Sequence, residues 1–420
     1  MSVLRKFIDI RAGEGKALAW SWLYVFALFL SYYVLRPIRE DLGVSGGVEN
    51  LPWLFTGTLL CMIAVNPMFG FAVRKWSRSK FIAITYRFFM MNLLVFMIFM
   101  ATASPNQLVW IGRAFFIWIS VFNLFVVSVF WSFIVDVFDS EQGARLFGFL
   151  AAGATLGGIA GSALTSALVG RVGHNWLLFA SLALIEVAVF ASRRLAKVSE
   201  RFRSRPAETE KGMGGGVFAG ISHTFRSPYL LGISAFIILY TVTSTFLYFQ
   251  QASIADQNFT DRATRTAFFA NIDLWVNILT LGFQLLLTAR LIGLVGLTAV
   301  LCALPFISTL GFLALAVYPT VAVLVAVQVT RRVSNFAFAK PAREVLFTSI
   351  PREDRYKAKN FIDTVIYRGG DQVASWSYVG LLAAGLTMSG ISFVAIPLSL
   401  VWFGVSVWLG RKGVRDAKSY

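Results

Sequence analysis

Long apolar segments alternate with short polar ones along the whole chain, and this pattern limits the fold more than any other feature. Twelve apolar runs are long enough to cross the roughly 30 Å core of a bilayer, which takes roughly 20 helical residues. The runs are residues 17–35, 51–73, 81–101, 107–135, 146–168, 176–192, 229–250, 266–288, 294–316, 319–339, 361–386 and 391–410. Because hydrocarbon offers no water to the backbone, each run must satisfy its own amides. The pattern predicts an all-α membrane protein with twelve transmembrane helices.

Composition narrows the class of protein further. The chain has 420 residues, of which 57% are hydrophobic and 14% charged, whereas soluble proteins carry roughly 25% charged residues. This excludes soluble enzymes, disordered proteins and fibrous proteins. Two cysteines (Cys61 and Cys302) and two histidines are too few for a disulfide framework or a metal cluster, so we expect no metal and no cofactor. No phosphate-binding loop of the G-x-x-x-x-G-K-[ST] type occurs, and we expect no enzymatic activity.

The formal charge of +17 follows the predicted topology. With the N-terminus placed in the cytoplasm, 28 of the 38 Lys and Arg residues fall on that side and five on the other. Such a division is typical of an even number of spans with both termini in the cytoplasm. The basic residues therefore indicate orientation in a lipid bilayer, and we expect no nucleic-acid partner.

The longest polar stretch, residues 193–228, divides the spans into six and six. We predict an N-terminal half (1–192), a cytoplasmic linker (193–228) and a C-terminal half (229–420). Two six-helix halves without an energy-coupling domain are typical of a secondary transporter that works by alternating access. We expect a multi-pass protein of the bacterial inner (plasma) membrane that functions as a monomer.

The loop between the second and third spans carries a first resemblance. Residues 70–80 (GFAVRKWSRSK) resemble the cytoplasmic signature of the major facilitator superfamily, except that Arg74 occupies its acidic position. The glycine allows two helices to approach closely, and the bases hold the loop at the cytoplasmic face. Acidic and basic residues between spans 4 and 5 lie on the same side. We expect a cytoplasmic gate formed by Gly70, Lys75, Arg78, Asp136, Glu141 and Arg145.

A second resemblance is spread over most of the chain. Its segments are 32–42 (YYVLRPIREDL), 130–133 (FWSF), 141–148 (EQGARLFG), 341–344 (PARE), 350–351 (IP), 357–359 (KAK) and 363–370 (DTVIYRGG). In this order they resemble the ATP/ADP translocases (TLC-type nucleotide exchangers), which implies antiport of a nucleotide-like anion. The chain departs from that family at Asp371, where a lysine is expected, and at Gln250 and Gln251, which we place in the loop after span 7.

Ionisable residues inside apolar runs are costly in lipid and point to a binding cavity. The N-terminal half supplies the substrate-binding candidates Tyr32, Tyr33, Arg36, Arg39 and Arg113, and the C-terminal half supplies Arg332, Asn335, Arg368 and Asp371. Arg331 and Arg332 differ in direction by about 100° on a helix, so one of them is structural. The resemblance to the ATP/ADP translocases implies a basic residue at position 332, and we therefore favour Arg332 for the cavity. Clusters from two halves that face each other are expected to bind the solute.

Acidic residues at depth leave a second mechanism open. A desolvated carboxylate can carry a proton across the membrane, and Asp371, Glu186 and Asp273 are the candidates. The alternative function is therefore proton-coupled uptake or efflux of another organic solute, such as a drug, a peptide or a siderophore.

Small residues recur four apart in the fifth span, at Gly153, Gly157 and Gly161. This spacing predicts a flat helix face that allows a second helix to approach closely.

Overall fold

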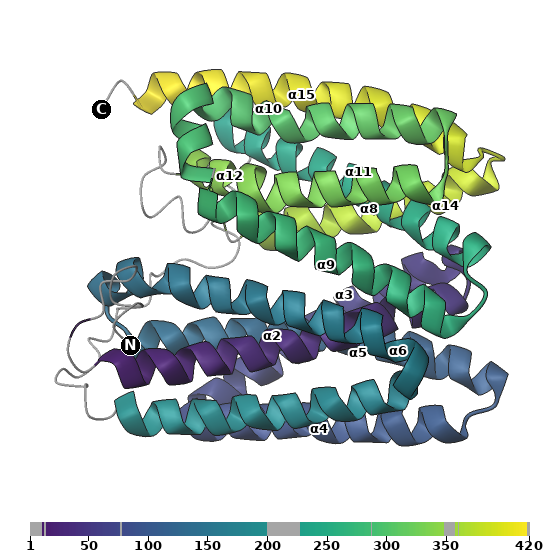
Figure 1. The fold of residues 1–420 in the computed structure, drawn as a ribbon. Helices are drawn as coiled ribbons and strands as arrows, with labels where there is room; N and C mark the ends of the chain where they lie inside the picture. Colours follow the sequence, from purple (N-terminus) through teal and green to yellow (C-terminus); the bar gives the residue numbers. More distant parts are fainter. Residues whose placement is uncertain are drawn as a thin grey trace. The chain divides into compact units, whose positions relative to one another are not determined.

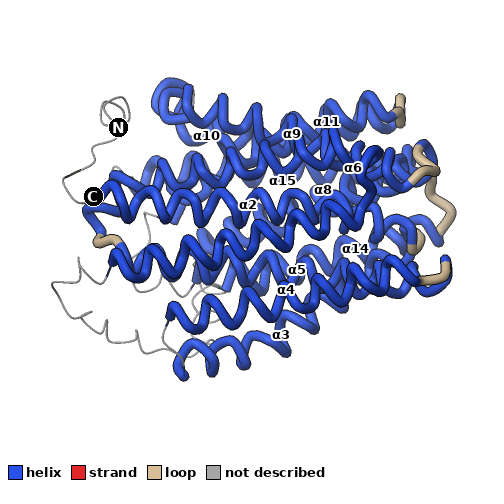
Figure 2. Tube along the Cα trace, turned by 60° about the horizontal axis from the view of Figure 1, so that its bottom comes forward, coloured by secondary structure: helices blue, strands red, loops and turns tan. Residues whose placement is uncertain are grey.

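The computed structural model describes residues 11, 14–75, 78–199, 227–286, 288–347, 358–359 and 361–417. These residues form helices joined by short loops and include no β-strand (Figure 2). The side chains of residues 66–79, 140, 144, 286–293 and 413–417 lie outside the description.

The helices follow one another along the chain as coloured in Figure 1. Their bounds are α2 (Glu14–Ser45), the 3-10 turn η1 (Val48–Asn50), α3 (Leu51–Lys75), α4 (Arg78–Thr102), α5 (Pro105–Val137), α6 (Ser140–Ser199), α8 (Pro228–Asn258), α9 (Arg262–Leu286), α10 (Thr288–Val317), α11 (Val321–Ser334), the π-helical turn η2 (Asn335–Ala339), α12 (Lys340–Leu346), the π-helical turn η4 (Ile362–Ile366), α14 (Tyr367–Ala383) and α15 (Met388–Ala417).

The predicted all-α fold is confirmed. Ten described stretches are long and apolar enough to cross a bilayer. The stretch in α6 contains two helices that meet at Gly173, whose φ of 76° lies in the left-handed region that favours glycine. The 17-residue α14 completes the set of twelve in the described part of the chain.

Two helices extend well beyond the predicted runs. The sequence analysis ended the first span near residue 35, but α2 continues through Arg36 and Pro37 to Ser45. It also placed Gln250 and Gln251 in a loop, whereas both are buried inside α8. Both predictions were wrong because polar side chains that find partners in the protein do not end a helix.

The helices pack as two units. Unit 1 contains the described residues of 1–47, 56–208 and 259–277, and unit 2 contains those of 48–55, 209–258 and 278–420. The predicted linker lies largely outside the described residues, so the division into 1–192, 193–228 and 229–420 stays a prediction.

In unit 1, α2 packs closely along α6 (Figure 1). A Cβ atom added at Gly157 would lie 2.6 Å from the carbonyl oxygen of Phe26, and one at Gly161 would lie 2.5 Å from that of Leu30. The predicted small-residue face therefore allows two backbones to touch.

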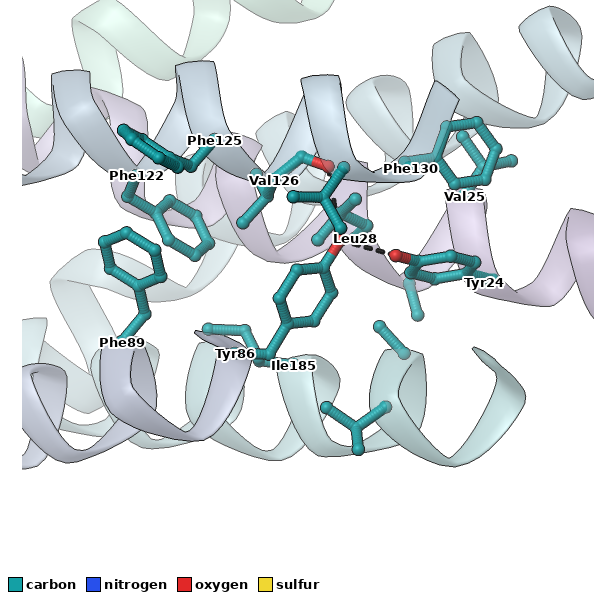
Figure 3. Close-up of a cluster of buried hydrophobic side chains, with 14 of the residues drawn as sticks. Tyr24, Val25, Leu28, Tyr86, Phe89, Phe122, Phe125, Val126, Phe130 and Ile185 are labelled. Atoms are coloured by element: carbon teal, nitrogen blue, oxygen red, sulfur yellow. Dashed lines mark hydrogen bonds between the residues drawn. The ribbon is translucent and has the colours of Figure 1, made fainter. Parts of the chain in front are cut away.

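The core of unit 1 also contains a pair of tyrosines (Figure 3). The hydroxyl of Tyr86, on α4, donates to the carbonyl oxygen of Val126 at 3.2 Å. Since that uses its one proton, the hydroxyl of Tyr24, on α2, donates to Tyr86 at 2.6 Å. The pair ties α2, α4 and α5 together inside an otherwise apolar core.

In unit 2, α15 packs on α8 and α10. Trp402 is fully buried, with its ring centroid 5.3 Å from that of Phe236 and 5.9 Å from that of Tyr240. This aromatic group forms one wall of the polar cluster described below.

Candidate functional site

The C-terminal part of α2 carries a row of ionised side chains in unit 1. Nη1 of Arg36 lies 3.2 Å from Oδ1 of Asp273 on α9, and its Nε lies 3.9 Å from Oε1 of Glu40. The same guanidinium sits over the ring of Tyr33, 5.7 Å from its centroid. The ring of Tyr32 meets that of Tyr33 edge-on at 5.4 Å. The structure thus brings Tyr32, Tyr33 and Arg36 together and adds two carboxylates.

Arg39 lies one turn further along α2. Its Nη2 donates to Glu40, its Nη1 donates to Oγ of Ser120 at 3.3 Å, and its guanidinium sits 4.7 Å from the ring centroid of Phe116. Both candidate arginines of α2 therefore share Glu40, a residue that the sequence analysis did not select.

Asp41 forms the most buried ionic group of unit 1. Its side chain is fully buried, and its two oxygens accept from Nε of Arg265 at 2.7 Å and Nε of Arg262 at 3.0 Å. Both arginines directly precede the apolar run 266–288, and nothing in the sequence suggests a role for them. Their partner lies more than 200 positions away in the sequence, so no local pattern links them.

Ionised side chains gather around α2 and α9 in unit 1. Arginines 36, 39, 262 and 265 form ion pairs there with the carboxylates of Glu40, Asp41 and Asp273. Guanidinium groups held in place in this way can bind an anion in their planar fork.

Arg113, the remaining candidate of unit 1, has a different set of neighbours. Its Nη2 donates to the carbonyl oxygen of Gly46 at 3.2 Å, and its guanidinium lies 4.5 Å from the ring centroid of Trp110. It adds a further cation near the loop that follows α2.

Unit 2 contains a second polar cluster, built around two tyrosines. Nδ2 of Asn335 donates to the hydroxyl of Tyr240 at 3.0 Å. The ring centroids of Tyr240 and Tyr367 lie 6.1 Å apart. The Tyr240 oxygen accepts from Asn335, and the two tyrosine hydroxyls are hydrogen-bonded to each other, which leaves one of their two protons for a further acceptor.

The acidic member of this cluster is Asp371 on α14. Its Oδ1 accepts from Oγ1 of Thr245 at 3.2 Å, and its Oδ2 lies 3.9 Å from Nη1 of Arg368. The long second distance marks a weak ion pair. The sequence analysis selected Asn335, Arg368 and Asp371, but it missed Tyr240 and Tyr367, which connect them.

Two π-helical turns position these side chains. The amide of Lys340 donates to the carbonyl of Asn335, and the amide of Tyr367 donates to that of Ile362, five residues back in each case. Asn335 begins the first turn, and Tyr367 and Arg368 directly follow the second. Single π turns inside helices occur frequently at functional sites.

Arg331 and Arg332 differ in their surroundings. Arg331 is buried and donates to four neutral oxygen atoms, whereas Arg332 is partly exposed. The choice of Arg332 for the cavity stays a prediction.

The other proton-coupling candidates are held in ion pairs. Oε1 of Glu186 lies 2.5 Å from Nη2 of Arg87, and both side chains are nearly half exposed. Asp273 is buried against Arg36. Of the three candidates, Asp371 has the longest ion-pair distance.

The expected cytoplasmic gate is described only in part. Glu14, buried at the start of α2, lies 2.9 Å from Nη2 of Arg145, and Glu141 lies 2.5 Å from Nη2 of Arg11. Asp136 is partly buried near the end of α5. The side chains of Gly70, Lys75 and Arg78 lie outside the description, so a latch between them and α5–α6 stays a prediction.

Gln250 and Gln251 make structural bridges within unit 2. Nε2 of Gln250 donates to Oγ of Ser392 at 2.7 Å, and Gln251 accepts from Gln328. These bonds tie α8 to α15 and to α11.

Comparison with known proteins identifies the fold and the family. The Major Facilitator Superfamily matches residues 18–370. No curated protein matches the sequence of the chain. Three solved structures resemble it over nearly its whole length. The nucleoside transporter NupG has a TM-score of 0.58 and 15% sequence identity, and the match covers 97% of this chain and 100% of that one. A bacterial homologue of the human lysosomal transporter Spinster has a TM-score of 0.59 and 12% identity, with 97% of this chain and 99% of that one covered. An auto-inhibited peptide transporter of the POT family has a TM-score of 0.62 and 13% identity, with 96% of this chain and 97% of that one covered. At these identities the likeness concerns the fold alone.

Proposed function

Since the chain belongs to the major facilitator superfamily, we propose that it is a secondary transporter that moves a small organic anion by alternating access. The observation that carries this proposal is the cluster of four arginines that ion pairs hold around α2 and α9 of unit 1. Arginine binds a carboxylate or a phosphate in its planar fork.

The proposed binding residues come from each unit. In unit 1 they are Arg36 and Arg39, with the rings of Tyr32 and Tyr33 beside them. In unit 2 they are Asn335, Arg368 and Asp371, joined by Tyr240 and Tyr367, and we retain Arg113 and Arg332 as further candidates.

Nucleotide-like anions are the first solutes to test. The segments that resemble the ATP/ADP translocases favour nucleotide antiport, and one similar structure is named as a nucleoside transporter. Arginine binds phosphate groups, and a base can stack on tyrosine rings.

Proton-coupled transport of another organic solute is the second candidate function. It is favoured by Asp371, whose carboxylate lies in a spanning helix with an arginine no closer than 3.9 Å. A carboxylate with so weak an ion pair can exchange a proton more readily than Glu186 or Asp273.

We propose the bacterial inner membrane as the location, with both termini in the cytoplasm and a monomer as the working unit. The distribution of basic residues supports this orientation, with 28 on one side and five on the other.

The test is a flux panel with the full chain in proteoliposomes. Uptake of labelled ATP, ADP, inorganic phosphate, citrate and a dipeptide is measured with and without internal ADP and with an imposed pH gradient. Uptake of ATP only into vesicles loaded with ADP supports nucleotide exchange, and uptake of another anion supports the broader proposal. Flux that follows the pH gradient and disappears in Asp371→Asn supports the second candidate. Uptake of the dipeptide alone, with Asp371→Asn unaffected, refutes both candidates.

Variants test the proposed binding residues. We expect Arg36→Gln and Arg368→Gln to reduce anion uptake by roughly tenfold or more, because each removes a charged hydrogen-bond donor. Arg87→Gln is the matched control, since it removes a cation from an ion pair that is nearly half exposed. Equal uptake in all three variants excludes Arg36 and Arg368 from the site.

A further inference from the structure

Arg331 stands apart from the other buried arginine of the described residues. Only Arg265 and Arg331 are buried in this part of the chain, at 5% and 3% exposure. Arg265 has the carboxylate of Asp41 at 2.7 Å. Arg331 has no carboxylate within ion-pair distance among the residues that the structure describes, so its charge is not neutralised locally.

Neutral oxygen atoms surround the guanidinium instead. Nε donates to Oγ of Ser308 at 2.9 Å, and Nη1 donates to Oγ of Ser244 at 2.8 Å. Nη2 donates to Oγ1 of Thr243 at 2.8 Å and to the carbonyl oxygen of Tyr240 at 3.3 Å. These hydrogen bonds fix the position of the guanidinium but do not neutralise its positive charge.

A purely structural role explains this arrangement poorly. Burying an ion without a counter-ion is costly, and apolar side chains of similar size pack helices at a lower cost. The hydroxyls of Thr243 and Ser308 already donate to carbonyls of their own helices, so they do not need an arginine for that purpose.

The position of the charge links it to the proposed site. The guanidinium carbon lies 5.4 Å from the ring centroid of Tyr240, whose hydroxyl accepts from Asn335 and whose ring lies 6.1 Å from that of Tyr367. The ring of Trp402, which packs against that of Tyr240, lies 6.0 Å from the same carbon. The positive charge of Arg331 therefore acts on the tyrosine cluster through packed side chains, where electrostatic interactions are stronger than in water.

We propose that Arg331 is a specificity-determining residue that makes the Tyr240–Tyr367 cluster selective for the anionic group of the solute. It acts through Tyr240: its positive field favours an acceptor of negative charge at the hydroxyls of this tyrosine pair and disfavours a cation. This inference rests on the proposed function and adds the residue that determines which sign of charge the site prefers on the solute.

The first test compares Arg331→Met with Arg331→Lys in the full chain, using ATP, ADP, inorganic phosphate and neutral adenosine as probes. Stabilisation of the purified protein by each probe and uptake into proteoliposomes are both measured. We expect Arg331→Met to raise the KM for the anion that the wild type takes up by roughly tenfold, and Arg331→Lys to keep it within about threefold, because lysine retains the charge. Arg87→Met is the control and should leave the KM unchanged.

The second test is the thermal midpoint of each variant without any probe. If the arginine is an uncompensated charge retained for function, Arg331→Met unfolds at the wild-type temperature or above it. A large fall in the midpoint together with an unchanged anion KM overturns the proposal and makes Arg331 structural. If the midpoint and anion binding both fall, Arg331→Lys decides: retained anion selectivity supports the charge, and its loss overturns it.

The two proposals fail in different ways. A wild-type protein that neither binds nor transports any of the anions refutes the proposed anion transport. A wild type that transports an anion, with Arg331→Met showing the same KM and the same preference over adenosine, refutes only the role of Arg331.

Discussion

Removal of the Asp41 carboxylate should be among the most destabilising single changes in unit 1. Asp41 is fully buried and accepts from two arginines, of which Arg265 is 6% exposed and Arg262 is 32% exposed at the side chain. Asp41→Asn removes the carboxylate that both arginines contact. Breaking a buried ion pair in this way costs about 3–5 kcal/mol. The exposed pair of Arg87 with Glu186 gives the contrast, since Arg87→Gln should cost about 1 kcal/mol or less.

The assay is the thermal unfolding midpoint of the purified protein in detergent, measured for each variant under the same conditions. Asp41→Asn should lower the midpoint most, Arg265→Gln less, since Asp41 keeps Arg262 at 3.0 Å, and Arg87→Gln least. The double variant Asp41→Asn with Arg265→Gln should be less destabilised than the sum of its parts, because it also removes one of the two cations that Asp41 contacts.

Two results contradict this reasoning. If Asp41→Asn lowers the midpoint no more than Arg87→Gln does, the buried carboxylate does not stabilise unit 1. If the double variant shows the full sum of the two single effects, the two residues are not energetically coupled.

Two other features of unit 1 give predictions of stability. Gly161→Ala should destabilise the protein by about 1–3 kcal/mol, because its Cβ would lie 2.5 Å from the carbonyl oxygen of Leu30. Gly148→Ala, with no atom within 4 Å of the added Cβ, should be neutral or slightly stabilising. Equal unfolding midpoints for the two variants would contradict the close-packing argument. Tyr86→Phe should cost about 1–3 kcal/mol and more than Tyr24→Phe, because it removes the partner of both a hydroxyl and a carbonyl of α5. A larger loss in Tyr24→Phe, measured by the same midpoint, shows that the assumed direction of the hydrogen bonds is wrong.

The helical fold could be predicted from the sequence because the bilayer permits few alternatives. An apolar run of sufficient length must form a helix, and glycines four apart must lie on one helix face. The three-residue spacing of Arg368 and Asp371 likewise placed them within reach of each other, at 3.9 Å.

The polar groups could be predicted only in part, because hydropathy does not determine the rotation of a helix. Arg331 and Arg332 are neighbours in the sequence, yet only Arg331 is buried. The partners of Asp41 lie beyond the reach of any local pattern. Tyr240 and Tyr367 resemble the many other aromatic residues of the spans until their contacts are known.

The two π-helical turns have a consequence for how these helices tolerate change. A turn closed over five residues holds one residue more than an ordinary α-helical turn. Deleting a single residue there restores a regular helix and leaves the side chains beyond the deletion close to their original directions, whereas the same deletion in a regular α-helical turn rotates them by about 100°. By the same geometry, moving the extra residue one step along the helix reorients the side chains that it passes, at the expense of only a few hydrogen bonds. A helix of this kind can change which side chains it presents without unwinding.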